Sequence, residues 1–247
     1  MTHMHIPDGI LPVWLWVSGF LLMFVFLAFS LHRIKTMDVK KKIPLLGTLS
    51  AAMLVAMTLE IVPIAYHLNL SVAAGILLGP SLGFVAAFIV NLMLALVGHG
   101  GITVLGLNTL LLGAEAVLGH ALFYLLRKSL PVFWRASVAT ALSLFVVSLL
   151  LIAIVGVSRV EIDAFTHEHA RSNEIATEEH DQDHAASSLT TFAIMVLGLG
   201  ALGWTLEAAV TGWVIQFIAR VKPDLLTHVL HAETERKADP LHSGGAS

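Results

Sequence analysis

The chain contains no cysteine among its 247 residues. Thiolate metal sites, disulfides and cysteine nucleophiles are therefore excluded, and a bound metal must be held by nitrogen or oxygen donors. Charged residues are also scarce: they make up 13% of the chain, whereas a typical soluble domain has about 25%. The formal net charge is only -3, so the sequence does not indicate a basic surface for nucleic acid. This shortage of charge favours a membrane protein.

Hydrophobic residues make up 57% of the chain and gather in long runs. A spanning helix needs roughly 20 apolar residues, and lipid forces the spanning backbone to be helical. The predicted helices cover residues 11–31, 45–62, 71–79, 80–98, 104–126, 132–157 and 189–218. The third and fourth are separated at Gly79-Pro80, a dipeptide typical of a turn. We therefore predict an all-α integral membrane protein, a bundle of about seven transmembrane helices.

Basic residues cluster after the first, fifth and last of these runs. The clusters are Arg33, Lys35, Lys40, Lys41 and Lys42; Arg127, Lys128 and Arg135; and Arg220 and Lys222. Cytoplasmic loops of membrane proteins are rich in Lys and Arg, so the N-terminus is expected outside and the C-terminus in the cytoplasm. We expect a multi-pass protein of the bacterial inner membrane.

The same reasoning divides the chain into five parts. They are an extracytoplasmic N-terminus (1–10), six transmembrane helices (11–157), a histidine-rich extracytoplasmic loop (158–188), a seventh helix (189–222) and a cytoplasmic tail (223–247).

The N-terminal residues, Met1-Thr2-His3-Met4-His5, combine histidine with a chain terminus. A free terminal amine, the amide nitrogen of an adjacent histidine and its imidazole can close two chelate rings on one metal. Such donors favour square-planar coordination, which is typical of Ni(II) or Cu(II). His67, in the outer break after the second run, is a candidate for the fourth position. A lone loop histidine is more often an ordinary surface residue, so His67 alone does not establish a site.

Three blocks of sequence resemble a known family. Met4-His5-Ile6-Pro7-Asp8-Gly9 resembles the N-terminal signature of the CbiM/NikM family, the substrate-binding membrane (S) components of energy-coupling-factor transporters for cobalt and nickel. Segments 77–80 and 98–108 also look like that family, and segment 207–212 is a weaker match. The resemblance extends from Met4 to about residue 218.

The resemblance implies a ligand set and partners. Met4 would supply its amine, His5 its amide and imidazole, and His67 the fourth nitrogen. The transported ligand would be Ni(II) or Co(II), with no permanent cofactor, and the resemblance suggests a link to cobalamin biosynthesis. The partners implied are ATPase subunits, a transmembrane coupling (T) subunit and a small accessory membrane subunit. The chain has no P-loop, so ATP hydrolysis is expected on separate subunits and the chain is not expected to be an enzyme.

Two features depart from the family pattern. Three residues precede Met4, so three explanations stay open: Met4 is the true start, Met1 is removed to expose Thr2-His3, or intact Met1-Thr2-His3 chelates the metal. His99 stands where family members commonly carry an aspartate. His3 and His99 are therefore alternative metal ligands.

Several polar or small residues have candidate supporting roles. Glu60 is a candidate to orient the His67 imidazole, the alternative being a position in water at the membrane interface, and the resemblance suggests that Asn108 fixes the ligand loop. Ala52 and Ala56 resemble the small-residue face that docks on the coupling subunit, the alternative being packing inside the bundle. The ionisable residues expected to pair with neighbouring helices, without binding metal, are Glu115, His120 and Glu207.

The segment 158–188 is rich in histidine and acidic residues. Its histidines are His167, His169, His180 and His184. Such a composition attracts metal weakly and cannot support a packed core, so we expect a disordered loop.

The competing functions are another kind of transporter, a sensor and an enzyme. A secondary divalent-metal permease would carry His-x4-Asp-His, but the nearest match, 180–184, has the wrong spacing. The His-Glu-x-x-His motif of a metalloprotease is absent. A metal-sensing membrane accessory protein stays open. The sequence favours the substrate-capture subunit of an ATP-driven importer of Ni(II) or Co(II).

Overall fold

The structure is a computed structural model that describes residues 12–35, 42–59, 67–98, 101–170 and 180–226. Side chains are described throughout these ranges except at 159–193, 195 and 199. The elements, in chain order, are α1 (Val13–Lys35), α2 (Ile43–Thr58), α3 (Ser71–Leu78), α4 (Pro80–Leu96), α5 (Leu105–Leu125), the short 3-10 helix η1 (Leu126–Lys128), α6 (Val132–Ala170) and α7 (His180–Val221). No strand occurs in the described ranges, so the prediction of a mainly helical protein is confirmed.

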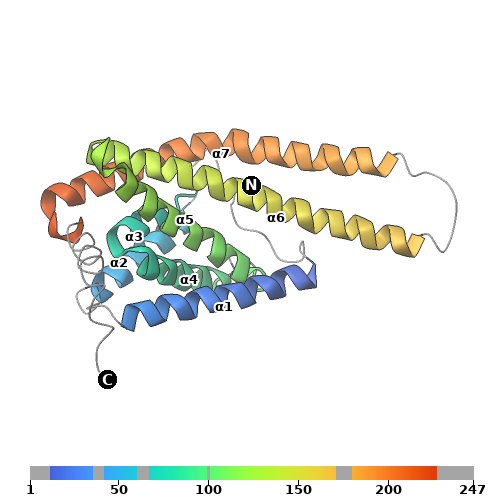
Figure 1. The fold of residues 1–247 in the computed structure, drawn as a ribbon, viewed down its shortest axis with the longest axis horizontal. Helices are drawn as coiled ribbons and strands as arrows, with labels where there is room; N and C mark the ends of the chain where they lie inside the picture. The colour runs from blue at the N-terminus through green and yellow to red at the C-terminus, as the bar shows by residue number, and fades with distance from the viewer. Residues whose placement is uncertain (1–11, 36–41, 60–66, 99–100, 171–179, 227–247) are drawn as a thin grey trace, which may run out of the picture.

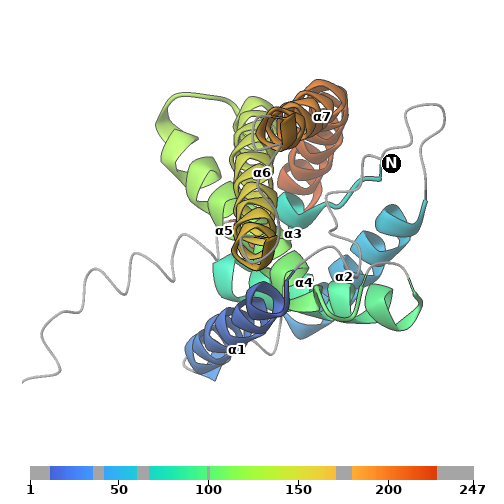
Figure 2. The ribbon, with the colours of Figure 1, turned by 90° about the vertical axis from the view of Figure 1, so that its right-hand side faces the viewer.

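The helices form a bundle from which a long hairpin extends (Figure 1). The hairpin consists of α6 and α7, which pack side by side. Viewed along the hairpin in Figure 2, α1 and α7 lie on opposite sides of the bundle, with α3 between them. Four helices are long and apolar enough to cross a membrane, over Val13–Lys35, Leu105–Lys128, Val132–Ser158 and Val196–Val221. Helices α2 and α4 are shorter apolar helices.

Helix α3 occupies the core of the bundle. All eight of its residues are buried, and it contacts α2, α4, α5, α6 and α7. The close approach to α5 depends on a missing side chain, because a Cβ on Gly75 would lie 2.0 Å from the carbonyl oxygen of Ala116. Small residues allow helices in a membrane to approach in this way.

Helix α3 is too short to span a bilayer. Eight residues extend only about 12 Å as an α-helix. Its C-terminus meets α4 at Gly79, where φ is +89°, a conformation that favours glycine. The turn predicted at Gly79-Pro80 is therefore confirmed. The residues just before α3, Asn69 and Leu70, are hydrogen-bonded to Glu115 of α5 and Glu207 of α7. Helix α3 therefore starts inside the bundle, where a short helix between two turns can be accommodated.

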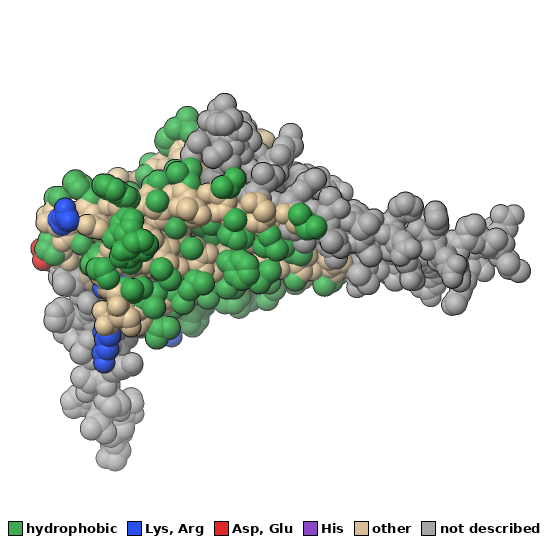
Figure 3. All heavy atoms as spheres, turned by 90° about the horizontal axis from the view of Figure 1, so that it is seen from above, with side chains coloured by type: hydrophobic (Ala, Val, Ile, Leu, Met, Phe, Trp, Pro, Cys, Tyr) green, Lys and Arg blue, Asp and Glu red, His purple; other side chains and the backbone are tan. Residues whose placement is uncertain are grey.

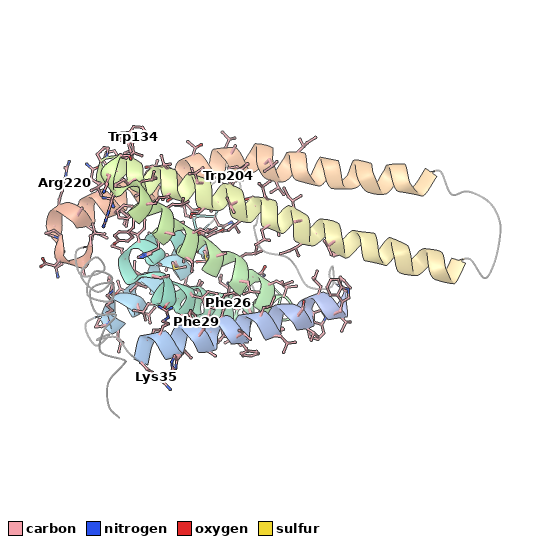
Figure 4. The ribbon with its side chains drawn as sticks, in the orientation of Figure 1. Phe26, Phe29, Lys35, Trp134, Trp204 and Arg220 are labelled. Atoms are coloured by element: carbon pink, nitrogen blue, oxygen red, sulfur yellow. The ribbon has the colours of Figure 1, made fainter. Side chains whose placement is uncertain are left out.

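The outer surface of the bundle is apolar. Large hydrophobic side chains of α1 are exposed, including Phe24 at 57% and Val25 at 63%, and Figure 4 shows Phe26 and Phe29 on the same helix. Hydrophobic side chains also cover the face seen in Figure 3. An apolar surface of this extent is typical of a protein that faces lipid.

Basic residues gather at one end of the bundle. Lys35 at the end of α1 and Arg220 at the end of α7 lie at the same end, opposite the tip of the α6–α7 hairpin (Figure 4). Lys and Arg side chains are also seen at that end in Figure 3. This arrangement agrees with the basic clusters used to predict the orientation of the chain, and the orientation itself stays a prediction.

The segment 158–188 differs from the expected disordered loop. Helix α6 continues to Ala170 and α7 begins at His180, with 39 and 42 residues respectively. At about 1.5 Å of rise per residue, helices of this length extend roughly 60 Å, twice the hydrocarbon thickness of about 30 Å. Extending an existing helix costs much less than starting one, so a polar sequence that would not fold alone continues two packed helices.

Candidate metal-binding region

The structure describes only part of the predicted metal site. Met4, His5, His3, Glu60 and His99 lie outside the described residues. His67 and Asn108 lie within them. The described residues contain no group of three or more His, Asp or Glu side chains that could hold a metal ion. Any site at His67 therefore needs donors from elsewhere, as the predicted N-terminal chelate would supply.

His67 begins the four-residue segment 67–70 that leads into α3. Its side chain is half-buried, and its Nδ1 atom is shielded from solvent. Because the chain advances at most about 3.6 Å per residue, His67 is close to the hydrogen bonds that hold the next residues. The direction of its imidazole therefore depends on how this segment is fixed.

A carboxylate from α7 holds the backbone of this segment. The amide of Leu70 donates to Glu207 Oε1 at 3.2 Å, and the amide of Asn69 donates to Glu207 Oε2 at 3.5 Å. Glu207 is fully buried. A carboxylate at the N-terminus of a helix accepts from free amide groups and lies at the positive end of the helix dipole. Glu207 thus anchors the start of α3 to α7.

A second carboxylate, from α5, holds the side chain of Asn69. The Asn69 Nδ2 atom donates to Glu115 Oε2 at 2.7 Å, while Asn69 Oδ1 accepts from the amide of Ser71 at 2.8 Å. Asn69 is 5% exposed and Glu115 is fully buried. The amide side chain therefore links α5 to the first turn of α3. We call Asn69, Glu115 and Glu207 the α3 clamp.

The backbone at Leu70 is strained. Leu70 has φ +55°, a left-handed conformation that is uncommon for a residue with a branched side chain. Such a conformation costs on the order of 1 kcal/mol or more and persists only when its surroundings fix it. The clamp supplies this fixation, because the amides of Asn69 and Leu70 donate to Glu207 and the amide of Ser71 donates to Asn69 Oδ1.

The pairing predicted for the ionisable residues of the helices is confirmed. Glu115 and Glu207 bond to the start of α3, and His120 Nδ1 lies 3.0 Å from the carbonyl oxygen of Gly75. Asn69 was not singled out from the sequence. A signal existed: asparagine is a preferred residue at helix N-termini, and it directly precedes the apolar run that forms α3.

Asn108 lies in the first turn of α5. It is 3% exposed, and its amide donates to the carbonyl oxygen of Val104 at 2.9 Å. The structure places it at the N-terminal end of α5, as expected, while its role in fixing the ligand loop stays a prediction. The histidines His167, His169, His180 and His184 lie on α6 and α7, but their side chains are outside the described part.

The small-residue face of α2 borders a groove. Ala52 and Ala56 line an apolar groove of about 570 Å³, together with Ala51, Val55, Leu59 and Leu68. Ala52 is exposed, and α2 contacts chiefly α3 and α4. Ala56 is half-buried, and docking on a coupling subunit and packing inside the bundle both stay predictions for this face. The groove also includes Leu68, the residue after His67.

Comparison with known proteins identifies the family. The family described as "CbiM: Cobalt uptake substrate-specific transmembrane region" matches residues 5–225. A relative from Haloquadratum walsbyi, named for metal transport, is 33% identical over 232 residues, which cover 90% of this chain and 93% of the relative. The cobalt transport protein CbiM of Clostridioides difficile is 34% identical over 151 residues, 55% of this chain and 59% of that protein.

Two solved structures share the fold. A truncated transition metal transporter has a TM-score of 0.70 at 19% identity, covering 88% of this chain and 99% of its own. Another transition metal transporter has a TM-score of 0.69 at 19% identity, covering 94% of this chain and 99% of its own. Together with the family match across nearly the whole chain, the apolar helices identify this chain as a multi-pass membrane component of transition metal uptake that belongs to the CbiM family.

Proposed function

We propose that this chain is the substrate-capture subunit of an ATP-driven energy-coupling-factor transporter that imports Ni(II) or Co(II) across the bacterial inner membrane. The observation that carries the proposal is the placement of His67. This histidine begins the segment 67–70, which leads into the buried helix α3 and is held at Asn69 and Leu70 by two carboxylates from other helices. A fixed imidazole beside an N-terminal chelate is a suitable fourth donor.

The proposed ligands are four nitrogen atoms. They are the amine of Met4, the amide and imidazole nitrogens of His5, and the imidazole of His67. Two considerations support this set: the chain has no cysteine, and the described residues hold no other cluster of metal-binding side chains. Planar nitrogen donors favour nickel over cobalt, in agreement with the Irving–Williams order.

The groove on α2 is the proposed contact with the coupling subunit. Its lining is apolar and includes three alanines, which would let a transmembrane helix approach closely. An occupant would also contact Leu68, and so the segment that carries His67. The ATPase subunits would act through that coupling subunit, since this chain has no P-loop, and a small accessory membrane subunit would complete the transporter.

The α6–α7 hairpin has a proposed accessory role. His167 and His169 lie near the end of α6, while His180 and His184 lie at the start of α7, so the helices bring both pairs to the tip of one hairpin. Acidic residues accompany them. This tip would attract metal cations weakly before capture, through its negative field.

A nickel titration tests the ligand set. The chain beginning at Met4 is compared with the same chain carrying one extra residue before Met4, and the visible absorption band of planar nickel is followed. We expect tight one-to-one binding that is lost on extension, because the extension converts the Met4 amine into an amide. Equal binding by both chains would overturn this ligand set and favour the Met1-Thr2-His3 chelate or His99.

Uptake measurements test the transport mechanism. We expect nickel accumulation in cells that express this chain only when its coupling and ATPase subunits are expressed with it. Accumulation with this chain alone would instead identify a secondary permease, and binding without any accumulation would favour a metal-sensing accessory protein.

A further inference from the structure

We propose that the α3 clamp (Asn69, Glu115 and Glu207) consists of positioning residues that set the direction of the His67 imidazole and so control metal affinity without touching the metal. The proposal rests on the proposed function, in which His67 is a ligand. It is carried by four hydrogen bonds that converge on residues 69–71 from α5, α7 and the segment itself.

The clamp makes more hydrogen bonds to the start of α3 than a helix N-terminus requires. A helix N-terminus is commonly satisfied by one local side chain, and Asn69 already provides that bond to the amide of Ser71. Glu115 and Glu207 come from two distant helices. Carboxyl groups placed at membrane depth are costly and mark functional sites. Two of them bound to one four-residue segment therefore indicate a function beyond helix capping.

The three residues differ in how directly they hold the backbone of the segment 67–70. Glu207 binds the backbone of Asn69 and Leu70, so it fixes the path of the chain itself. Glu115 acts through the Asn69 side chain, whose Nδ2 atom donates to Glu115 Oε2 at 2.7 Å. Asn69 is thus the shared element, and its loss would release both the link to α5 and the local bond to Ser71.

The consequence for metal binding follows from the strained backbone at Leu70. Without the clamp, Leu70 would relax from φ +55° toward an ordinary conformation, and the preceding residues would rotate with it. His67 lies three residues away and would leave the plane of the other three donors. Losing such supporting hydrogen bonds typically lowers metal affinity 10- to 100-fold.

The test compares nickel affinity with stability in full-length variants. Asn69→Ala and Glu207→Gln are expected to weaken nickel binding about 10- to 100-fold. At saturation, their visible band should move to longer wavelength in the same direction as in His67→Ala, because an oxygen donor replaces the imidazole. Glu115→Gln keeps an oxygen that can accept from Asn69 and should stay within about threefold of the parent chain, a rescue that Glu115→Ala should not show.

Two control variants separate positioning from a general loss of stability. Thr211→Val alters a fully buried side chain that lies one turn along α7 from Glu207. The hydroxyl of Thr211 makes no hydrogen bond. Arg135→Ala removes two hydrogen bonds from α6 to the carbonyl oxygen of Phe123 on α5, at 3.2 and 3.1 Å. Phe123 lies about two turns along α5 from Glu115 of the clamp. Arg135→Ala should lower the unfolding midpoint, and both controls should leave the nickel affinity and band unchanged.

The outcomes distinguish this inference from the proposed function. If the parent chain binds nickel and His67→Ala binds it more weakly with a shifted band, but Asn69→Ala and Glu207→Gln bind within threefold of the parent, the positioning role is wrong and the proposed function stands. The positioning role is also wrong if Arg135→Ala weakens nickel binding as much as Asn69→Ala for the same loss of midpoint. If the parent chain binds no nickel, or His67→Ala binds it normally, the proposed ligand set itself fails.

Discussion

Replacing Gly75 with alanine should disturb the whole metal-binding region from the centre of the bundle. The added Cβ would lie 2.0 Å from the carbonyl oxygen of Ala116, whereas ordinary contact begins at 3.4 Å. The obstacle is backbone, which cannot rotate away as a side chain can. Helix α3 must therefore move away from α5 by about 1.4 Å, and overpacking of this kind typically costs about 1–3 kcal/mol.

The displacement is large enough to break the link between α3 and α5. The Asn69–Glu115 hydrogen bond is 2.7 Å long, and a shift of the size required at Gly75 would take it beyond the 3.2 Å that usually limits an N–H···O bond. The contact between His120 and the carbonyl oxygen of Gly75, now at 3.0 Å, would lengthen as well. Gly75→Ala should therefore lower both the unfolding midpoint and the nickel affinity, even though Gly75 is not a ligand.

The assay measures the unfolding midpoint in detergent and the dissociation constant for nickel. Gly47→Ala is the matched control, because Gly47 also lies inside a helix but a Cβ there would meet nothing within 4 Å. We expect the control to match or exceed the parent in stability, since alanine is the better helix former. A midpoint and affinity for Gly75→Ala equal to those of Gly47→Ala would refute the reasoning about α3 packing.

Three further predictions concern pH, docking and the turn before α4. Nickel affinity should fall on acidification, because protons compete with the metal for the nitrogen ligands. The dissociation constant is measured at pH 6 and pH 8, which lie on either side of the pKa of free histidine, roughly 6.5. The same dissociation constant at both pH values would contradict nitrogen ligation. Ala52→Leu should reduce uptake by the assembled transporter and leave nickel binding by the isolated chain unchanged. The control is Thr48→Leu, one turn away on the exposed face of α2. Equal uptake by both variants would exclude the groove as the docking site. Gly79→Ala should lower the unfolding midpoint because φ is +89°, at a cost of about 1–3 kcal/mol, and an unchanged midpoint would show that the turn relaxes.

The sequence predicted the helical fold because membrane helices have a simple physical signature. The number of spans stays a prediction, since four of the described helices are long and apolar enough to cross a membrane. Continuous apolar runs and the basic residues beside them are local features, and Gly79-Pro80 marked the turn between α3 and α4 correctly. The pairing of Glu115 and Glu207 was also predictable, since isolated carboxyl groups at membrane depth need partners. Asparagine before an apolar run is a local signal for a helix start. That Asn69 is the shared partner of both carboxyl groups was not predictable, because it lies 46 residues from Glu115 and 138 from Glu207 in sequence.

The hairpin shows where composition misleads. The polar, acidic segment 158–188 has the composition of a disordered chain, yet much of it continues α6 and α7. Composition describes a segment as if it stood alone. Here both ends of the segment are attached to packed helices, so nucleation, the costly step of helix formation, is already complete.

The segment 67–70 receives two opposed sets of contacts, and this gives the proposed transport cycle a physical basis. On its inner side, Asn69 and Leu70 bond to buried carboxyl groups of α5 and α7. On its outer side, Leu68 lines the groove of α2 in which the coupling subunit is proposed to dock. A ligand can change an equilibrium only by binding two states differently. A coupling-subunit helix in the groove would contact Leu68, directly beside His67, and could therefore bind one arrangement of the segment more tightly than the other. The clamp, in this proposal, favours the metal-binding arrangement. Capture and release would then be decided by competition between these contacts over four residues, without any rearrangement of the α4–α5 core.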